Sequence, residues 1–100
     1  MIVVVFRARI RTDCDVAAFG ALYEEMYGLV SQVQGFRGVK DFSATDGEAV
    51  TIVEFDSRTA LDAWKHHPDH IRAKSRGRNE FFSEYSIQVC EVLERYGLPG

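Results

Sequence analysis

One long stripe of apolar residues constrains this chain most. Its members recur at steps of three and four, as one face of an α-helix requires: Val16, Phe19, Tyr23, Met26, Tyr27, Val30 and Val33. The spacing predicts a helix that runs to about Gln34, and residues 12–15 are rich in side chains that cap a helix start. Gly35 suits the left-handed residue that follows a helix end. We interpret the aromatic members of the stripe as core.

The residues before this helix alternate with period two, which predicts a strand over residues 2–11. Even-numbered positions are apolar, whereas the odd-numbered face combines Val3 and Val5 with Arg7, Arg9 and Arg11. If that face is covered, Arg7 needs a carboxylate partner or an anionic ligand group, because an unpaired buried charge is costly. After the helix, residues 36–45 and 48–56 are expected to form an antiparallel pair, joined by the turn-forming pair Asp46-Gly47.

The second half of the chain predicts two helical pieces and a strand. Asp56 or Ser57 caps a short helix that carries Ala60, Leu61 and Trp64 on one side. That helix must end or bend before Pro68, which opens a second piece running toward Phe81 with Gly77 as a weak point. The last strand is expected over residues 85–96.

The order strand, helix, strand, strand, helix, strand predicts one domain over residues 1–100. Its expected class is α+β, a ferredoxin-like sandwich with a four-stranded antiparallel sheet. Both sheet faces carry apolar area, and an exposed apolar face of that size indicates a covering partner. RNA-recognition modules share this element order, and residues 35–42 resemble their basic and aromatic segment. However, that segment lies on the second strand, and the chain has a net charge of −3. We therefore expect no nucleic-acid partner and no anionic membrane surface.

The termini and cysteines set the expected location. The apolar run over residues 2–6 is far shorter than a membrane-spanning helix, and no basic region precedes it. A cytoplasmic protein is therefore expected. Cys14 and Cys90 form no closely spaced pair, which predicts free, packed thiols.

A family resemblance rests on motifs spread over most of the chain. These are GF-x-G at residues 35–38, the DG hairpin, FDSRTALDAW at residues 55–64, HPDH at residues 67–70, GR-x-x-FF at residues 77–82 and YSIQVCEV at residues 85–92. Together they resemble the antibiotic biosynthesis monooxygenase domain family up to about Tyr96. The resemblance implies a homodimer whose sheets pack face to face into a dimeric α+β barrel. It also implies a pocket in which a phenol loses a proton and reacts directly with dioxygen, with no cofactor.

Candidate site residues cluster between Trp64 and Tyr85. Trp64 matches the family's helix tryptophan and is a candidate pocket wall or N–H donor, with core filling as the alternative. His70 is the best candidate for proton transfer, since imidazole titrates near neutral pH. Asn79 completes the candidate catalytic set. Candidate substrate-binding residues are Arg78, Tyr85, His67 and Arg7. For each of them an ordinary structural role is the alternative.

Two other chemistries are weighed on the same residues. Pro68 separates His66 from His70 and spoils a continuous helical face for metal ligands, so no metal is expected. The haem-degrading branch of the family uses a strand-one asparagine, the helix tryptophan and a later histidine. The matching positions here are Phe6 or Arg7 and about Lys74. His70 lies one turn earlier and could bind haem only in a shifted geometry, so we expect the cofactor-free reaction in preference to haem chemistry. We predict a monooxygenase of a small aromatic substrate, a phenol, quinol or polyketide-like compound. The alternative is a non-enzymatic dimer that binds a small ligand or acts as an interaction module.

Overall fold

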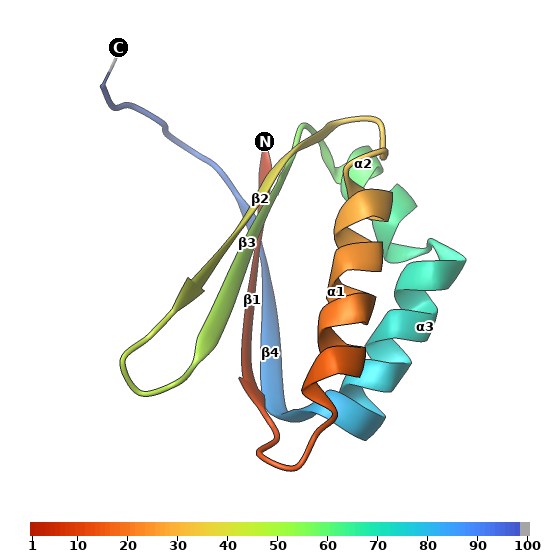
Figure 1. Cartoon of the computed structure of the whole chain (residues 1–100). Helices are drawn as coiled ribbons and strands as arrows, with labels where there is room; N and C mark the ends of the chain where they lie inside the picture. Colours follow the sequence, from red (N-terminus) through yellow and green to blue (C-terminus); the bar gives the residue numbers. More distant parts are fainter. Residues whose placement is uncertain (99–100) are drawn as a thin grey trace.

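The computed structural model describes residues 1–98 as a four-stranded sheet covered by helices on one face (Figure 1). The elements in order are β1 (Ile2–Ile10), α1 (Val16–Val30), β2 (Phe36–Ser43), β3 (Ala49–Phe55), α2 (Arg58–Lys65), α3 (Pro68–Arg76), the π-helix η1 (Gly77–Phe81) and β4 (Phe82–Glu91). The strands lie in the order β2-β3-β1-β4, and every neighbouring pair is antiparallel. The ferredoxin-like α+β prediction is therefore confirmed. Among residues 1–98, every helix is too short or too polar to cross a lipid bilayer.

Several predicted boundaries were wrong. Helix α1 begins as expected, with the Asp15 carboxylate accepting from the Ala18 N–H at 3.0 Å, but it ends at Val30 and not at Gln34. Strand β4 covers residues 82–91 in place of 85–96. Its neighbour β1 explains both ends, because Phe82 already pairs with Ile10 and the register ends at Ile2 with Glu91. Beyond that point β1 offers no further strand residue for pairing. The other three strands are also one or two residues shorter than expected.

Two glycines adopt the positive φ angles that their turns require. Gly47 has φ +91° in the β2–β3 hairpin, which the Ala44 N–H closes onto the Glu48 carbonyl at 2.8 Å. Gly35 has φ +93° as predicted, but it lies in the turn before β2 and does not follow the helix directly, because α1 ends at Val30 with Ser31 as its C-cap. A Cβ atom at Gly35 would lie 2.7 Å from the Ala60 Cβ, which is too close for a side chain. The glycine therefore allows α2 to approach the start of β2.

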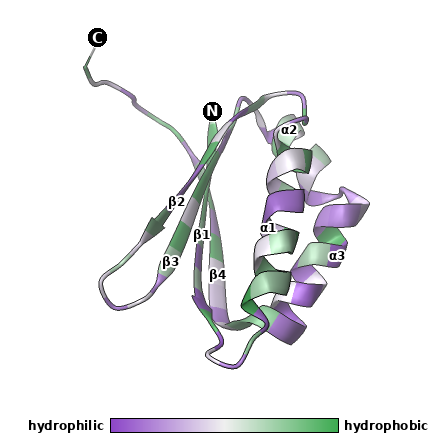
Figure 2. Cartoon of the chain, viewed as in Figure 1, coloured by the Kyte–Doolittle hydropathy of each residue, from purple (hydrophilic) through white to green (hydrophobic). Residues whose placement is uncertain are grey.

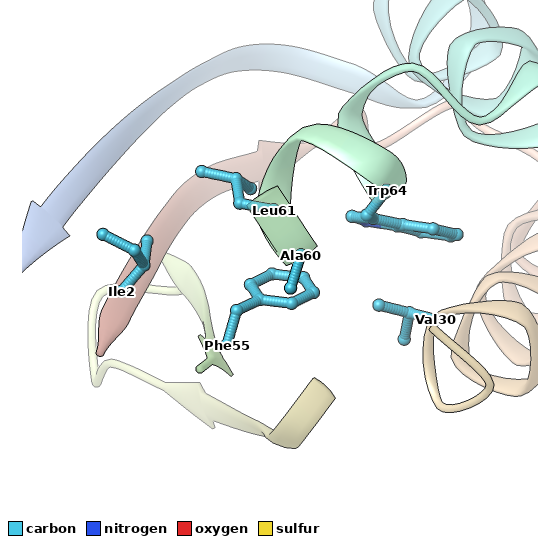
Figure 3. Packing of buried hydrophobic residues seen from close by; sticks show 6 residues of the cluster. All are labelled: Ile2, Val30, Phe55, Ala60, Leu61 and Trp64. Atoms are coloured by element: carbon cyan, nitrogen blue, oxygen red, sulfur yellow. The ribbon is translucent and has the colours of Figure 1, made fainter. Parts of the chain in front are cut away.

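Buried side chains form two clusters between the helices and the sheet. The first unites the strand ends, the end of α1 and α2 (Figure 3): Ile2, Val30, Phe55, Ala60, Leu61 and Trp64. The second contains Leu22, Ala73 and Phe81, and the partly buried Met26 packs against both clusters. Leu22 was missing from the predicted stripe, whereas Val16 and Tyr27 are exposed. Helix α1 packs on α3 through Leu22 and on the strands through Val30, so its buried arc extends past the predicted stripe.

The face of the sheet that points away from the helices carries both apolar and charged residues. In the register, Val5 lies opposite Ile52 and Arg7 lies opposite Val50, so these four side chains share that face. Hydrophobic colouring follows β1 and β3, whereas much of α3 is hydrophilic (Figure 2). Cys14 and Cys90 are free thiols, but Cys90 is exposed, so the prediction that it is packed was wrong. A sheet with helices on one face alone leaves the opposite face available to a partner.

Candidate functional site

The site that the sequence predicted is centred on Trp64 and His70, which lie against each other. Trp64 is the penultimate residue of α2 and is 7% exposed. Pro68 begins α3 and turns the chain back, so that the imidazole of His70 stacks on the indole with ring centroids 4.3 Å apart and planes 16° from parallel. The His70 Nδ1 lies 3.1 Å from the Trp64 carbonyl oxygen. One ring contact and one hydrogen bond therefore hold His70 in place.

His67 has a local structural role at the same corner. It is the N-cap of α3, where its Nδ1 accepts from the Asp69 N–H at 3.1 Å. Its ring centroid lies 5.7 Å from that of Trp64. Because Nδ1 is used by the cap, only Nε2 remains for a ligand. His66 is exposed, as expected for a residue next to the helix break.

Burial controls the charge of His70. Removal from water lowers the pKa of His70 to about 4, and the nearby positive charges of Lys74 and His67 act in the same direction. The hydrogen bond to the Trp64 carbonyl opposes this shift only in part. A carbonyl oxygen can only accept, so Nδ1 carries the hydrogen and the neutral ring presents a lone pair at Nε2. His70 is therefore a neutral hydrogen-bond acceptor at physiological pH.

This state limits the proton chemistry of His70. A free phenol has a pKa of about 10, so full proton transfer to an imidazole with a pKa of about 4 is uphill by roughly 8 kcal/mol. A phenolate beside the ring would raise the histidine pKa and reduce this cost. His70 is thus suited to accept a hydrogen bond from a hydroxyl group, and to accept its proton when the resulting anion lies close by.

The other predicted site residues lie elsewhere. Arg78 and Asn79 are exposed on η1, at the opposite end of α3 from Trp64. The eight residues from His70 to Arg78 correspond to roughly 12 Å of helix. Asn79 donates from Nδ2 to the Ser75 hydroxyl at 3.4 Å, and its carbonyl accepts from Arg11 at 3.2 Å. The structure therefore does not bring these two residues to the Trp64 end.

Tyr85 and Arg7 lie on opposite faces of the sheet. Tyr85 is on the helix-facing side of β4, 37% exposed, and its ring stacks on Phe6 at 5.8 Å. Arg7 is on the open face, where its guanidinium binds the Glu48 carboxylate at 2.9 Å. Arg7 has the carboxylate partner that the sequence required, which leaves it no need of an anionic ligand.

Two surface hollows lie at the ends of the sheet. One, of about 450 Å³, is lined by Ile10, Arg11, Thr12, Asp13 and Ser83. The other, of about 530 Å³, is lined by Met1, Ile2, Asp56, Ser57, Arg58, Val89 and Glu91. Neither is lined by Trp64 or His70. In the isolated chain Trp64 is a core residue, and its indole packs with α2 and the end of α1 (Figure 3).

Sequence reasoning missed a polar group between α1 and the sheet. The Tyr23 hydroxyl donates to one oxygen of Asp41, and the Thr51 hydroxyl donates to the other at 2.6 Å. A register shift near the start of β2 places Asp41 and Val39 on the helix-facing side together with Phe36. Strict alternation from Phe36 would put Asp41 on the other face. The bulge is thus what hid this group from the sequence pattern.

Among residues 1–98, the side chains differ from the ligand sets that metal ions and the family's haem branch use. Within residues 1–98, no three His, Cys, Asp or Glu side chains gather as a metal site requires. At the two strand-one positions nearest to the haem branch's asparagine, Phe6 packs against Phe82 and Tyr85 with ring centroids 5.4 and 5.8 Å away, and Arg7 pairs with Glu48 at 2.9 Å. Phe6 cannot supply the polar contact of an asparagine.

The family match in sequence covers residues from β1 to α3, which include Trp64 and its neighbours. The sequence model of the family described as "Antibiotic biosynthesis monooxygenase" matches residues 1–76. The uncharacterized protein YqjZ of Bacillus subtilis is 34% identical over 74 residues, which are 74% of this chain and 65% of YqjZ. The match thus spans slightly less than two thirds of that relative. The family match includes Trp64, His67 and His70, and it ends before Arg78, Asn79 and Tyr85.

Solved structures share the fold over nearly the whole chain. Rv0793 from Mycobacterium tuberculosis has a TM-score of 0.82 at 23% identity, covering 96% of this chain and 98% of its own. A putative antibiotic biosynthesis monooxygenase from Deinococcus radiodurans has a TM-score of 0.84 at 14% identity, and the match covers 100% of both chains. SnoaB, a cofactor-independent oxygenase from Streptomyces nogalater, has a TM-score of 0.78 at 15% identity, and the match covers 99% of this chain and 97% of SnoaB. Identities this low establish the fold alone. With the family model matching residues 1–76 and the complete fold shared with these structures, the chain belongs to the antibiotic biosynthesis monooxygenase family.

Proposed function

We propose that this protein is a monooxygenase that oxidises a small aromatic substrate, a phenol, quinol or polyketide-like compound, with dioxygen and without a cofactor. Family membership supports the reaction class, and SnoaB is a cofactor-independent oxygenase of the same fold. The observation that carries the proposal is the stacked pair of Trp64 and His70. It combines an aromatic surface with a neutral acceptor nitrogen, and both residues lie within the family match.

In the proposed reaction the substrate supplies all four electrons that dioxygen takes up. The phenol transfers its proton toward His70, and the electron-rich ring carbon forms a bond to one oxygen atom. Breaking the O–O bond then releases the second oxygen as water, so that a phenol and O2 yield a quinone and H2O. Trp64 orients the ring by stacking or through its indole N–H. Because the substrate supplies all the electrons, the proposed reaction needs no external reductant.

We further propose that the active form is a homodimer. The open face of the sheet carries the apolar side chains Val3, Val5, Phe42, Val50 and Ile52. Phe42 is 48% exposed in the single chain, and on the same face β4 exposes Ser86, Gln88 and Cys90. A specific interface removes roughly 1,200 to 2,000 Å² of surface from water, an area that a four-stranded sheet face of this kind can supply. A second copy packed on that face would form the family's α+β barrel.

A non-enzymatic, ligand-binding dimer is a second candidate, and one observation favours it. Trp64 is buried in the core, and neither hollow at the sheet ends is lined by it. An enzyme of this class should instead direct Trp64 and a polar group into a cavity that holds the substrate. For the oxygenase proposal, Trp64 or its neighbours must move when the aromatic ligand binds.

Oxygen uptake separates these candidates. The purified protein is mixed with a panel of phenols, naphthols and quinols, and with haem plus a reductant, while dissolved oxygen and products are followed. Oxygen-dependent formation of a quinone from one of the aromatic compounds, without added metal or flavin, supports the proposed function. Binding of an aromatic compound without oxygen uptake supports the ligand-binding dimer. Turnover that appears only with haem and reductant contradicts the cofactor-free proposal.

A further inference from the structure

The polar group formed by Tyr23, Asp41 and Thr51 occupies an unusual place for a carboxylate. Asp41 lies on the helix-facing side of β2, opposite Thr51 of β3, and Tyr23 reaches it from the middle of α1. The other positions of β2 and β3 on this side include Phe36, Val39 and Val53, which are apolar. Asp41 itself is exposed, whereas Tyr23 and Thr51 are half-buried. An ionised group therefore borders the interior and remains accessible from outside.

The hydrogen bonds within this group leave it able to accept further hydrogen bonds but not to donate them. Tyr23 and Thr51 each have one hydroxyl hydrogen, and each directs it to the Asp41 carboxylate. Burial, and then the hydrogen bond to Asp41, raise the pKa of Tyr23, so its hydroxyl keeps its proton. What remains on all three side chains is lone pairs, together with the negative charge of Asp41. The group can accept hydrogen bonds from a ligand, but it has no hydrogen left to donate.

Aromatic surface adjoins this acceptor group. Phe6 of β1 lies directly opposite Thr51 in the register, so the two side chains share the helix-facing side. The Phe19 ring lies 6.4 Å from the Tyr23 ring on the same helix. An aromatic ligand with a hydroxyl group would match both features, because its ring would contact the aromatic side chains while its O–H donates to Asp41. A carboxylate or phosphate ligand would be repelled.

We propose that Tyr23, Asp41 and Thr51 form a binding site for the hydroxyl group of an aromatic ligand, with Asp41 as the acceptor. The inference rests on the proposed function, because it assigns to this side of the fold a second hydroxyl group of the aromatic substrate, distinct from the one that transfers its proton toward His70. It selects hydroxylated aromatics over their ethers and over anionic aromatics. Tyr23 and Thr51 are positioning residues that orient the carboxylate.

The test compares two ligands that differ in one hydrogen-bond donor, 2-naphthol and 2-methoxynaphthalene. Binding of each is measured by fluorescence titration for the wild type and for Asp41→Asn, Tyr23→Phe and Glu24→Gln. The wild type should prefer 2-naphthol about tenfold or more, as expected for a hydrogen bond to a charged acceptor. Asp41→Asn should reduce that preference severalfold. Tyr23→Phe should reduce it less than Asp41→Asn does, since the carboxylate remains but loses one of the two hydroxyl groups that orient it. Glu24→Gln removes the same charge from an exposed neighbour of Tyr23 and should behave as the wild type does.

The outcomes separate this site from the reaction. If Asp41→Asn and the wild type prefer 2-naphthol equally, and circular dichroism shows that both proteins are folded, the proposed site is overturned. Absence of any preference in the wild type overturns it as well, even if a phenol is oxidised, and the proposed function then stands alone. A preference that depends on Asp41 supports the site, even if the protein consumes no oxygen with any compound of the panel. In that case the monooxygenase proposal fails and the hydroxyl-binding site remains.

Discussion

Replacing His70 should remove a large part of the pH dependence of folding. Its pKa is about 4 in the folded protein, compared with 6.5 for an unperturbed histidine. Between these values the unfolded chain binds a proton at this position and the folded chain does not. Proton binding therefore stabilises the unfolded state relative to the folded state as the pH falls. Stability decreases from pH 6.5 toward pH 4, and this group changes it no further below that range.

The magnitude follows from the two pKa values. The shift of 2.5 units corresponds to about 3 kcal/mol over the whole range, at about 1.4 kcal/mol per unit. Lowering the pH from 7.5 to 5 should decrease the free energy of unfolding by about 2 kcal/mol, because the imidazole of the unfolded chain is almost fully protonated at pH 5. A domain of this size is typically stable by 5 to 15 kcal/mol, so the loss is easily measured.

Urea unfolding at fixed protein concentration measures this effect between pH 5 and 7.5. His70→Gln keeps a polar side chain that does not titrate, and it should flatten the stability profile by about 2 kcal/mol relative to the wild type. His66→Gln is the matched control, because it removes an exposed histidine from the same segment and should leave the profile nearly parallel to that of the wild type. Parallel profiles for the wild type and His70→Gln would refute the conclusion that burial keeps His70 neutral.

The remaining predictions concern activity, the fold, assembly and haem. If a phenolic substrate is found, His70→Ala should lower turnover about 10²- to 10⁴-fold with a much smaller effect on folding, and wild-type turnover would remove His70 from the mechanism. Trp64→Phe removes only the indole N–H. If that N–H donates to substrate, the free-energy loss in turnover, measured by kinetics, should exceed the loss of stability, measured by thermal unfolding. Gly35→Ala should destabilise by about 1 to 3 kcal/mol in urea unfolding, because φ is positive and Ala60 is too close. Gly28→Ala has no neighbour within 4 Å and should be neutral or stabilising. Sedimentation at micromolar concentration should show a dimer, and a clean 11.3 kDa monomer would contradict it. Titration with haem should give no sharp Soret band at one haem per chain. Such a band, abolished by His70→Ala, would favour haem chemistry over the cofactor-free reaction.

The sequence by itself determined the element order and therefore the fold class. Period-two and 3.6-residue patterns are properties of local backbone geometry, so they located all four strands and the helices without tertiary information. The break at Pro68 and the positive φ angle of Gly35 are local as well, and both were predicted. The cap of α2 was predicted at Asp56 or Ser57, and the structure has Ser57. Element ends were less accurate because they depend on neighbours. Strand β4 stops at Glu91 where its partner β1 runs out, and no pattern within β4 records that.

Only the tertiary structure decided which residues meet. The Trp64 and His70 stack joins two helices across a proline turn, and the low pKa of His70 follows from burial that a sequence does not display. The structure also separated Arg78 and Asn79 from Trp64, because α3 lies between them. Asp41 meets Tyr23 and Thr51 only because a bulge in β2 reverses the face it would otherwise occupy. Contacts between distant segments depend on register and packing, and these are set by the whole fold and not by any one stretch of residues.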